Sequence, residues 1–314
     1  MLDLGRLRLL RELEALGTIA ATAGALGYTP SAVSQQLAVL EREAGVKLLA
    51  RAGRGVRLTD AGRVLAAHAS TLLAAAEEAE ADLARTAPTI GGTVRIAAFQ
   101  TATLQLVIPV VAALAVAHPQ LRVEIVEAEV EEALPDLRRR RIDLLIADEY
   151  DGLPRERHAD LRRETLLREQ VRLVLPADHP QARGRRRPPI AALAGAVWSS
   201  AQVGTGHHAM VRNACRSLGG FEPDLRHASN DLLILLELVR ATGTIALLPD
   251  LVHTAGDGSV VTRTPAEGAL HREVHALTRR TGTPRPALAA VSDELRAQAA
   301  RAAPPHDGRA PPAR

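Results

Sequence analysis

The N-terminal part of the chain carries apolar residues at helical spacing. Leu4, Leu7, Leu10 and Leu13 recur every three residues and predict a first helix. Between residues 18 and 58 the pattern predicts a short helix, a turn that contains Gly27, a second helix and an arginine-rich hairpin. This order of elements is typical of a winged helix-turn-helix, which enters the major groove of DNA.

The second helix of this motif has an apolar face and well-placed start signals. Val33, Leu37 and Leu40 recur at i, i+4 and i+7, so we expect them to be buried. Pro30 suits the first helical position, where a missing N–H costs nothing, and Thr29 before it can act as N-cap. The pattern therefore predicts a helix that begins near residue 30.

The polar face of the same helix supplies candidate DNA contacts. Ser31 and Ser34 lie on this face, and Gln35 is one turn beyond Ser31. Gln pairs with adenine edges, whereas Ser and Thr hydroxyls usually bind phosphates. An amphipathic helix of an unrelated bundle would look similar, but arginines flank Gly53 and Gly55 in the hairpin and favour a wing near a phosphate backbone. The candidate DNA-binding residues are Thr29, Ser31, Ala32, Ser34, Gln35, Arg51, Arg54 and Arg57.

One long helix is predicted over residues 59–86. Its apolar residues are spaced seven, four, three and four apart, as in a coiled-coil seam, and they are Leu65, Leu72, Ala76, Ala79 and Leu83. The alternative is a helix packed on its own domain, but a 60-residue domain cannot cover so long a stripe. Pro88 to Gly92 breaks the pattern and marks a hinge.

Residues 93 to about 300 alternate strands with helices. Strands at 93–99, 121–127 and 142–147, with helices between them, make a βαβαβ order. This order predicts a doubly wound parallel sheet with helices on both faces. The second half carries further strands and helices, and its elements are predicted at 171–175, 197–199, after His207, from Asn230 to Ala241 and at 245–248. A strand at 274–278 should return to the first half before a final helix that ends near Ala302.

The chain resembles the LysR-type transcriptional regulators along nearly its whole length. The most specific part is the run Ser31-x-x-Ser34-x-x-Leu37-x-x-Leu40-Glu41-x-x-x-Gly45-Val46-x-Leu48-Leu49-x-Arg51, followed by Leu58-Thr59-Asp60-Ala61-Gly62. Two departures stand out. Leu49 stands where the family usually has Phe, so the position stays apolar. Gly24 lies inside a predicted helix, where glycine lowers helix stability by roughly 1 kcal/mol relative to Ala.

This resemblance implies a domain order and a function. A winged helix-turn-helix at 1–58 would bind an interrupted inverted repeat in a double-stranded DNA operator, followed by a linker and dimerisation helix with its hinge at 59–91. An effector domain at 92–302 would have the two-lobed fold of periplasmic solute-binding proteins, with lobe I at about 92–165 and 264–302 and lobe II at about 166–263.

The resemblance also implies partners. The chain would self-associate through residues 59–86 as a dimer or a tetramer, respond to a small-molecule effector and have RNA polymerase as a further candidate partner. The tail at 303–314 is rich in Pro, Gly and Arg, so we expect it to be disordered.

Ligands of such sheets bind at the carboxyl ends of strands, in the crevice between the halves. Thr101 and Thr205 precede helices there, where hydroxyls and backbone N–H groups suit an anion, although each can instead simply cap its helix. Glu127, Glu129, Asp148 and Glu149 lie at neighbouring strand ends and either favour a cationic or polyhydroxy ligand or are solvated. The candidate effector-binding residues are Phe99, Gln100, Thr101, Thr103, Glu127, Glu149, Ser199, Ser200, Thr205 and Asn230.

Composition and charge limit the remaining classes of protein. The net charge is only +3 despite 39 Lys and Arg, so bulk charge does not itself show DNA binding. Cys215 is the only cysteine, which excludes an intramolecular disulfide. The charged start of the chain argues against a signal peptide, and no 18-residue run is both apolar and uncharged. We therefore expect a cytoplasmic protein without a membrane span.

Signatures of metal sites and of enzymes are missing from the sequence. His207 and His208 are adjacent, so their side chains diverge on a helix, and no metal or other cofactor is expected. Ser199, Ser200 and His207 suggest a hydrolase, but the sequence has no G-x-S-x-G elbow. It also has no P-loop and no dinucleotide-binding fingerprint. We predict a regulator and not an enzyme. The alternative is a small-molecule binding protein or enzyme of the solute-binding-protein fold with a vestigial DNA-binding module.

Overall fold

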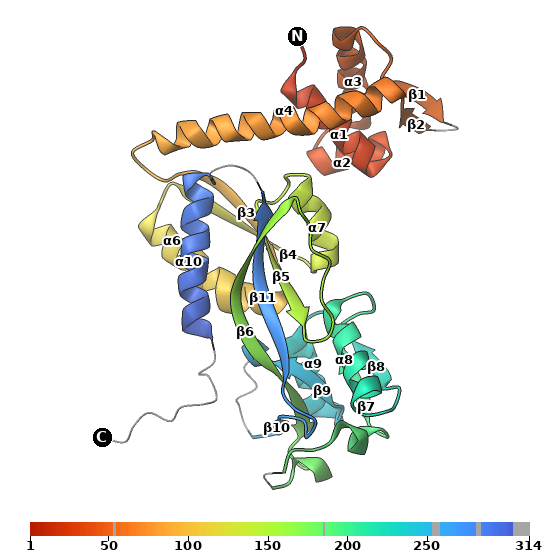
Figure 1. The fold of residues 1–314 in the computed structure, drawn as a ribbon, viewed down its shortest axis with the longest axis vertical. Coiled ribbons are helices and arrows are strands. Elements are labelled where there is room, and N and C mark those ends of the chain that lie inside the picture. Colours follow the sequence, from red (N-terminus) through yellow and green to blue (C-terminus); the bar gives the residue numbers. More distant parts are fainter. Residues whose placement is uncertain (53–54, 185, 253–257, 281–283, 304–314) are drawn as a thin grey trace. The chain divides into compact units, whose positions relative to one another are not determined.

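A computed structural model gives the structure of the chain, and it describes residues 1–52, 55–184, 186–252, 258–280 and 284–303 (Figure 1). The chain divides into two compact units. One is formed chiefly by Met1–Ala87 and the other by Pro88–Arg280 with the segment from Pro286 onward. The boundaries at 58, 91 and 302 and the division into lobes stay predictions, and most of the predicted tail lies outside the described residues.

The N-terminal unit has the predicted order of three helices, a hairpin and a long helix. Its elements are α1 (Leu4–Leu16), α2 (Ile19–Leu26), α3 (Pro30–Ala44), β1 (Leu49–Ala52), β2 (Gly55–Leu58) and α4 (Asp60–Arg85). Each of the first three helices starts at a side-chain cap and ends at a left-handed glycine, which are Gly17, Gly27 and Gly45. Strong start and stop signals thus explain why these short helices form where the sequence predicts them.

A single core joins the helices of this unit. Val33, Leu37 and Leu40 of α3 are buried, which confirms the predicted apolar face. They pack with Leu7 and Leu10 of α1 in the same cluster. The opposite face of α3 is therefore the one that this unit presents outward.

Hydrogen bonds to the Glu41 carboxylate link the hairpin to α3. This carboxylate accepts hydrogen bonds from the backbone N–H groups of Leu48 and Leu49 at 2.9 and 3.1 Å, and from Lys47 Nζ at 3.0 Å. Partial burial raises the pKa of Glu41, but these hydrogen bonds outweigh it and hold the pKa below its ordinary value. Gly62 allows the close approach of α4 to this hairpin, because a Cβ at this position would lie 2.2 Å from the Leu48 carbonyl oxygen.

Helix α4 is one continuous element, as predicted. Its start packs on its own unit through Ala66 and Ala69, which are buried in the core. Farther along, Leu72 and Leu83 are exposed. The chain itself thus leaves these residues of the predicted seam uncovered.

The C-terminal unit is built on a seven-stranded sheet. The strands are β3 (Gly92–Ala98), β4 (Leu121–Glu127), β5 (Leu144–Tyr150), β6 (Leu161–Pro176), β9 (Ala246–Pro249), β10 (Val260–Arg263) and β11 (Leu270–Arg279), in the order β10-β6-β11-β5-β3-β4 with β9 also on β6. Strand β3 pairs in parallel with β4 and β5, which confirms the predicted βαβαβ unit. The parallel arrangement ends there, because β11 runs antiparallel to both β5 and β6.

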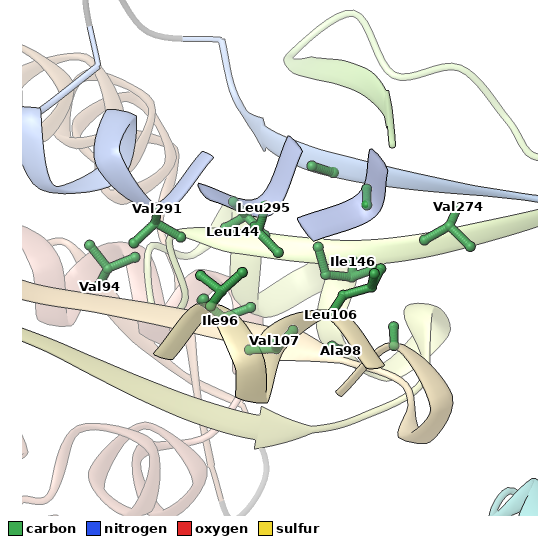
Figure 2. Packing of buried hydrophobic residues seen from close by; sticks show 14 of the residues in the cluster. Val94, Ile96, Ala98, Leu106, Val107, Leu144, Ile146, Val274, Val291 and Leu295 are labelled. Atoms are coloured by element: carbon green, nitrogen blue, oxygen red, sulfur yellow. The ribbon is translucent and has the colours of Figure 1, made fainter. Parts of the chain in front are cut away.

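Helices cover both faces of the β3–β4–β5 part of the sheet, as predicted. They are α5 (Gln100–Ala102), a π-helical turn (Thr103–Val107), α6 (Ile108–Ala117), α7 (Val130–Arg138) and α10 (Pro286–Ala302). Ile96 and Ile146 pack against the segment after β3 and against α10, and Figure 2 shows Val291 of α10 and Leu106 beside them. Ala97 lies on the opposite face with the residues of α7.

The expectation that no 18-residue run is both apolar and uncharged is wrong, because the helical segment Gln100–Ala117 carries no charged residue and is long and apolar enough by composition to cross a membrane. This segment places Leu106, Val110 and Leu114 in the core that covers the sheet. Its position in that core accounts for its apolar composition, so it gives no separate support to a membrane span.

The rest of this unit forms a second α/β half. Its elements are β7 (Val197–Ser200), α8 (Gly206–Ser217), β8 (Asp224–Ala228) and α9 (Leu232–Thr242), with short 3₁₀ turns at Pro180–Ala182, Ile190–Leu193 and Asp250–Val252. Strand β6 pairs with β11 at first and with β9 and β10 in its last residues, so it belongs to both halves. Figure 1 shows β6 and β11 side by side along this unit. We call the half around β3–β5 lobe I and the half around β7–β9 lobe II.

Candidate nucleic-acid interface and effector cleft

The start of α3 is held by local hydrogen bonds. Thr29 Oγ1 accepts from the Ala32 backbone N–H at 3.2 Å and lies 3.1 Å from Ser31 Oγ. Thr29 and Ser31 are exposed, and Ala32 is half-buried. The Thr29 hydroxyl thus caps the helix as predicted while staying accessible at its tip.

Gln35 is the most available polar side chain on the outer face of α3. It is exposed, and nothing within the described ranges hydrogen-bonds to its amide. Ser34 beside it donates from Oγ to the Pro30 carbonyl oxygen at 3.0 Å, so its hydrogen is already in use. Tyr28 is also exposed at the start of α3. A lone tyrosine before a helix is more often ordinary surface, so Tyr28 carries no signal in the sequence that marks it as a DNA contact.

The two described arginines of the hairpin point to opposite sides of it. Arg57 pairs with Ala50 and Arg51 with Val56, so alternation of side chains along the strands places the arginines on different faces. Both are exposed and form no ion pair with the described residues. The predicted contact Arg54 lies outside the described residues. One face of the hairpin can therefore offer Arg51 or Arg57 to a phosphate backbone, but not both.

We expect Arg57→Ala to weaken binding to every duplex alike. Removing one true phosphate contact should lower the magnitude of the slope of log K against log[salt] by about 0.9. Fluorescence anisotropy at several salt concentrations measures this slope. Arg51→Ala is the matched control, because it removes the same charge from the other face of the hairpin. An unchanged slope for Arg57→Ala would take Arg57 out of the interface.

Four predicted effector residues meet in a narrow cleft between lobes I and II. Phe99, Gln100 and Thr101 follow β3, whereas Asn230 precedes α9. The cleft has a volume of only about 20 Å³, and its other lining residues are Glu129, Asp148, Tyr150, Ala201, His207, Leu232 and Arg272. Both lobes thus contribute to it.

Three predicted effector residues of lobe I lie away from this cleft. Thr103 donates from Oγ1 to the Ala98 carbonyl oxygen at 3.2 Å, inside the helical segment. Glu127 is exposed at the end of β4. Glu149 instead accepts from Arg163 at 2.6 Å, because alternation along β5 turns it away from Asp148.

In lobe II the remaining predicted residues lie behind the cleft wall. Ser199 is fully buried. Ser200 Oγ donates to the Ala201 carbonyl oxygen at 2.8 Å and lies 3.1 Å from His208 Nδ1. Thr205 caps α8 by accepting from the His208 N–H at 3.3 Å. The alternative that Thr205 caps a helix therefore fits its position.

Arg272, which the sequence analysis did not identify, lies at the centre of the cleft. Its side chain is 1% exposed, and it donates to Glu169 Oε1 from Nε at 2.9 Å and from Nη2 at 2.6 Å. Nη2 also donates to Thr101 Oγ1 at 3.1 Å, and the guanidinium carbon is 4.8 Å from the centre of the Phe99 ring. The two charges face each other because Arg272 pairs with Glu169 across β11 and β6.

Two polar groups in the cleft lack partners. The carboxylate of Glu129 forms no hydrogen bond or ion pair with the described residues, and burial, with Asp148 and Glu131 nearby, raises its pKa to about 7. The buried Gln100 Oε1 likewise accepts no hydrogen bond there. Asp148 is different, because Arg155 Nη2 donates to its Oδ1 at 3.0 Å. The cleft thus offers unpartnered acceptors.

His207 has a structural role in the cleft wall. Its Nδ1 accepts from the Ala201 N–H at 3.1 Å, so the proton lies on Nε2, which donates to the Leu247 carbonyl oxygen at 2.8 Å. Burial lowers the pKa of this imidazole to about 4. Both ring nitrogens are in use, and across the described ranges no group of three or more His, Cys, Asp or Glu residues could hold a metal ion.

Comparison with known proteins settles the family. The profile of the LysR substrate binding domain matches residues 89–300, and that of the bacterial regulatory helix-turn-helix protein, lysR family, matches residues 4–63. The chain belongs to the LysR family. This LysR-type protein is therefore a DNA-binding transcriptional regulator with an effector-binding domain, and not an enzyme.

Individual relatives support the same assignment. The regulator is 29% identical to the transcriptional regulator MetR of Escherichia coli K12 over 274 residues, which cover 87% of this chain and 83% of MetR. It is 35% identical to a probable hydrogen peroxide-inducible genes activator of Mycobacterium xenopi over 167 residues, 53% of this chain and 85% of that protein.

Solved structures show the same fold over nearly the whole chain. A full-length OxyR variant from Pseudomonas aeruginosa has a TM-score of 0.67 at 22% identity, with 94% of this chain and 95% of that chain covered. Full-length CbnR complexed with its target DNA has a TM-score of 0.53 at 19% identity, with coverages of 95% and 100%. The predicted fold class of the regulator is thereby confirmed.

Proposed function

We propose that the regulator reads an interrupted inverted repeat with α3 and its hairpin, using Gln35 for bases and the other exposed residues for phosphates. The observation that supports this most directly is the exposed, unpartnered amide of Gln35 on the outer face of α3. A glutamine in that position can make two hydrogen bonds to an adenine.

A palindromic site requires two copies of α3, and we propose that α4 brings them together. Leu72 and Leu83 are 43% and 70% exposed, and both belong to the predicted seam. Pairing of two such helices would bury them. A dimer, or a tetramer made of two dimers, follows from this proposal. As a regulator of transcription it would work in the cytoplasm, with RNA polymerase as a partner.

For the effector we propose a small molecule that carries an ammonium group. Glu129 and Gln100 offer unpartnered acceptors, and the two carboxylates that line the cleft, those of Glu129 and Asp148, outnumber the guanidinium of Arg272, which Glu169 already pairs. A cleft of about 20 Å³ holds little more than one such group, so a larger effector requires the lobes to open. This favours the cationic ligand among the alternatives that the sequence left open.

A direct reaction with peroxide does not suit this regulator, although one relative is described as a probable peroxide-inducible activator. Its only cysteine, Cys215, is fully buried, and burial raises the pKa of the thiol to about 12. Reaction with peroxide requires a thiolate. We therefore propose a signal that binds non-covalently.

We expect affinity for an ammonium effector to rise with pH. The ligand binds the ionised Glu129, and with a pKa of about 7 in the free protein that carboxyl must lose a proton on binding at lower pH. Affinity should thus be about tenfold lower at pH 6 than at pH 8, where it levels off. A thermal-shift screen of amines and amino acids with the full chain identifies the ligand, and isothermal titration at pH 6 and pH 8 measures the effect.

Two variants sharpen this test. Glu129→Gln should weaken binding and remove its pH dependence, because the amide does not titrate. Thr205→Val is the control, since Thr205 caps α8 behind the cleft wall, and it should bind like the wild type. A ligand that binds Glu129→Gln with unchanged affinity and unchanged pH dependence would exclude this site.

A further inference from the structure

Lobe I also holds a hollow that is larger than the cleft. A cavity of about 470 Å³ lies between α7, β5, β11, the start of β6 and the segment 155–158 that connects β5 to β6. Its volume is within the range of about 300–1,000 Å³ that is usual for small-molecule sites, whereas the cleft measures about 20 Å³. All of its lining residues belong to the described part of lobe I and its strands.

The floor of this cavity is apolar. Val130 and Leu134 come from α7, Leu161 starts β6, and Leu277 belongs to β11. Val130 and Leu161 are buried in the small core under α7. Such a wall suits a short hydrocarbon chain or ring, because removing apolar surface from water is favourable.

The rim of the cavity is basic. Four arginines line it, Arg155, Arg157, Arg163 and Arg280, against two carboxylates, Asp148 and Glu156. Arg155 is already paired with Glu131 and Asp148, and Arg163 with Glu149. The guanidinium groups of Arg157 and Arg280 beside the apolar floor therefore favour a ligand with one acidic group and an apolar body. Guanidinium groups match a carboxylate especially well, because they can donate two parallel hydrogen bonds.

Arg157 is the rim arginine best placed to receive such a group. Its side chain is 64% exposed, and the ion pair that the described residues offer it is to Glu149 Oε1 at 3.5 Å. Glu149 is bound more closely by Arg163, whose Nη1 is 2.6 Å from Oε2. An exposed pair of this kind holds Arg157 only weakly, so a ligand carboxylate can replace it at little cost.

A neutral imidazole lies at the inner end of the cavity. His275 is buried, and Arg163 donates to its Nε2, so the ring proton lies on Nδ1, 3.2 Å from Thr165 Oγ1. Burial, with Arg163 beside it, lowers the pKa of His275 to about 4. His275 therefore adds no positive charge to the cavity near neutral pH.

We propose that this cavity is a second ligand site, distinct from the cleft, that binds an amphiphilic monocarboxylate. The hydrocarbon part lies on Leu134 and Leu277, and the carboxylate binds Arg157 at the rim. Asp148 lines both hollows, and Arg155 Nη2 donates to its Oδ1 at 3.0 Å. The two sites thus share one wall.

Isothermal titration of the full chain with octanoate tests this site. Octanoate should bind, whereas its methyl ester and octylamine, which keep the chain but lose the negative charge, should bind at least tenfold more weakly. Octyl phosphate is the third comparison. Equal binding of octanoate and its methyl ester would overturn the proposal, and a tenfold preference for octyl phosphate would replace the carboxylate by a phosphate.

Variants locate the binding. Arg157→Glu should weaken the binding of octanoate at least tenfold. The variant should still fold, because the Arg157 side chain is largely exposed. Arg122→Glu is the matched control, since Arg122 is 75% exposed on β4 and does not line the cavity. Leu134→Trp, which fills the cavity, should abolish octanoate binding but not amine binding in the cleft. Wild-type affinity for octanoate in both Arg157→Glu and Leu134→Trp would contradict the site.

Discussion

Replacing Arg272 by methionine is expected to lower the free energy of unfolding by about 3–5 kcal/mol. The change removes the guanidinium from between the lobes and leaves Glu169, whose side chain is fully buried, without its positive partner. Thr101 Oγ1 loses its donor as well. Urea unfolding of the C-terminal unit, followed by the fluorescence of the buried Trp198, measures the loss.

A double variant separates the buried charge from the lost packing. Glu169→Gln keeps an amide oxygen that can accept the Leu251 N–H, which now donates to Glu169 Oε2 at 2.7 Å. Combining it with Arg272→Met should therefore recover much of the lost stability, because no unpaired charge remains. A loss below about 1 kcal/mol for Arg272→Met alone would show that the buried ion pair contributes little to the stability of this unit.

The second large effect is expected at the DNA surface. Gln35→Ala should weaken binding to the specific operator by about 1–3 kcal/mol and leave binding to random duplex nearly unchanged. The reason is that an amide paired with a base edge contributes only at the correct sequence. Fluorescence anisotropy with the two labelled duplexes at one salt concentration gives both affinities.

Ser34→Ala is the matched control for Gln35. Ser34 Oγ already donates to the Pro30 carbonyl oxygen, so only its lone pairs remain for DNA. We expect a smaller loss that is the same for both duplexes. Equal losses on operator and random duplex for Gln35→Ala would show that Gln35 does not read bases.

Local signals explain how much of the fold the sequence predicts. The helices of the N-terminal unit start at capping side chains and end at glycines, and both features are visible in the sequence. Apolar spacing identifies the buried face of α3, and the runs at 93–99 and 121–127 predict β3 and β4 closely. These elements depend on neighbours in the chain, so one sequence suffices.

Pairing between residues that are distant in the chain could not be predicted from the sequence. Strand β6 begins at Leu161, but only 171–175 was predicted, because charged residues such as Arg162, Arg163 and Glu164 hide its first half. The same holds for Arg272 and Glu169, which become partners only through the register of β11 on β6. That register depends on tertiary structure, and so do the central ion pair of the cleft and the second cavity.

Strand ends were a partial guide to the cleft. Phe99, Gln100 and Thr101 line the cleft, because they follow a central parallel strand. Glu127 also follows a strand, but β4 is at the edge of the sheet, and its end is exposed. The order of strands in the sheet thus decides which strand ends reach the cleft, and local sequence patterns do not predict that order.

The central claim is that this chain reads a specific DNA sequence through α3. Repeated selection from a random duplex pool with the full-length protein, followed by footprinting of the enriched duplex, tests it most directly. The account predicts an interrupted inverted repeat that the wild type protects and that Gln35→Ala binds about 1–3 kcal/mol more weakly, so that it discriminates less against random duplex. Enrichment of no sequence, or equal protection of enriched and random duplexes by the wild type, would contradict it.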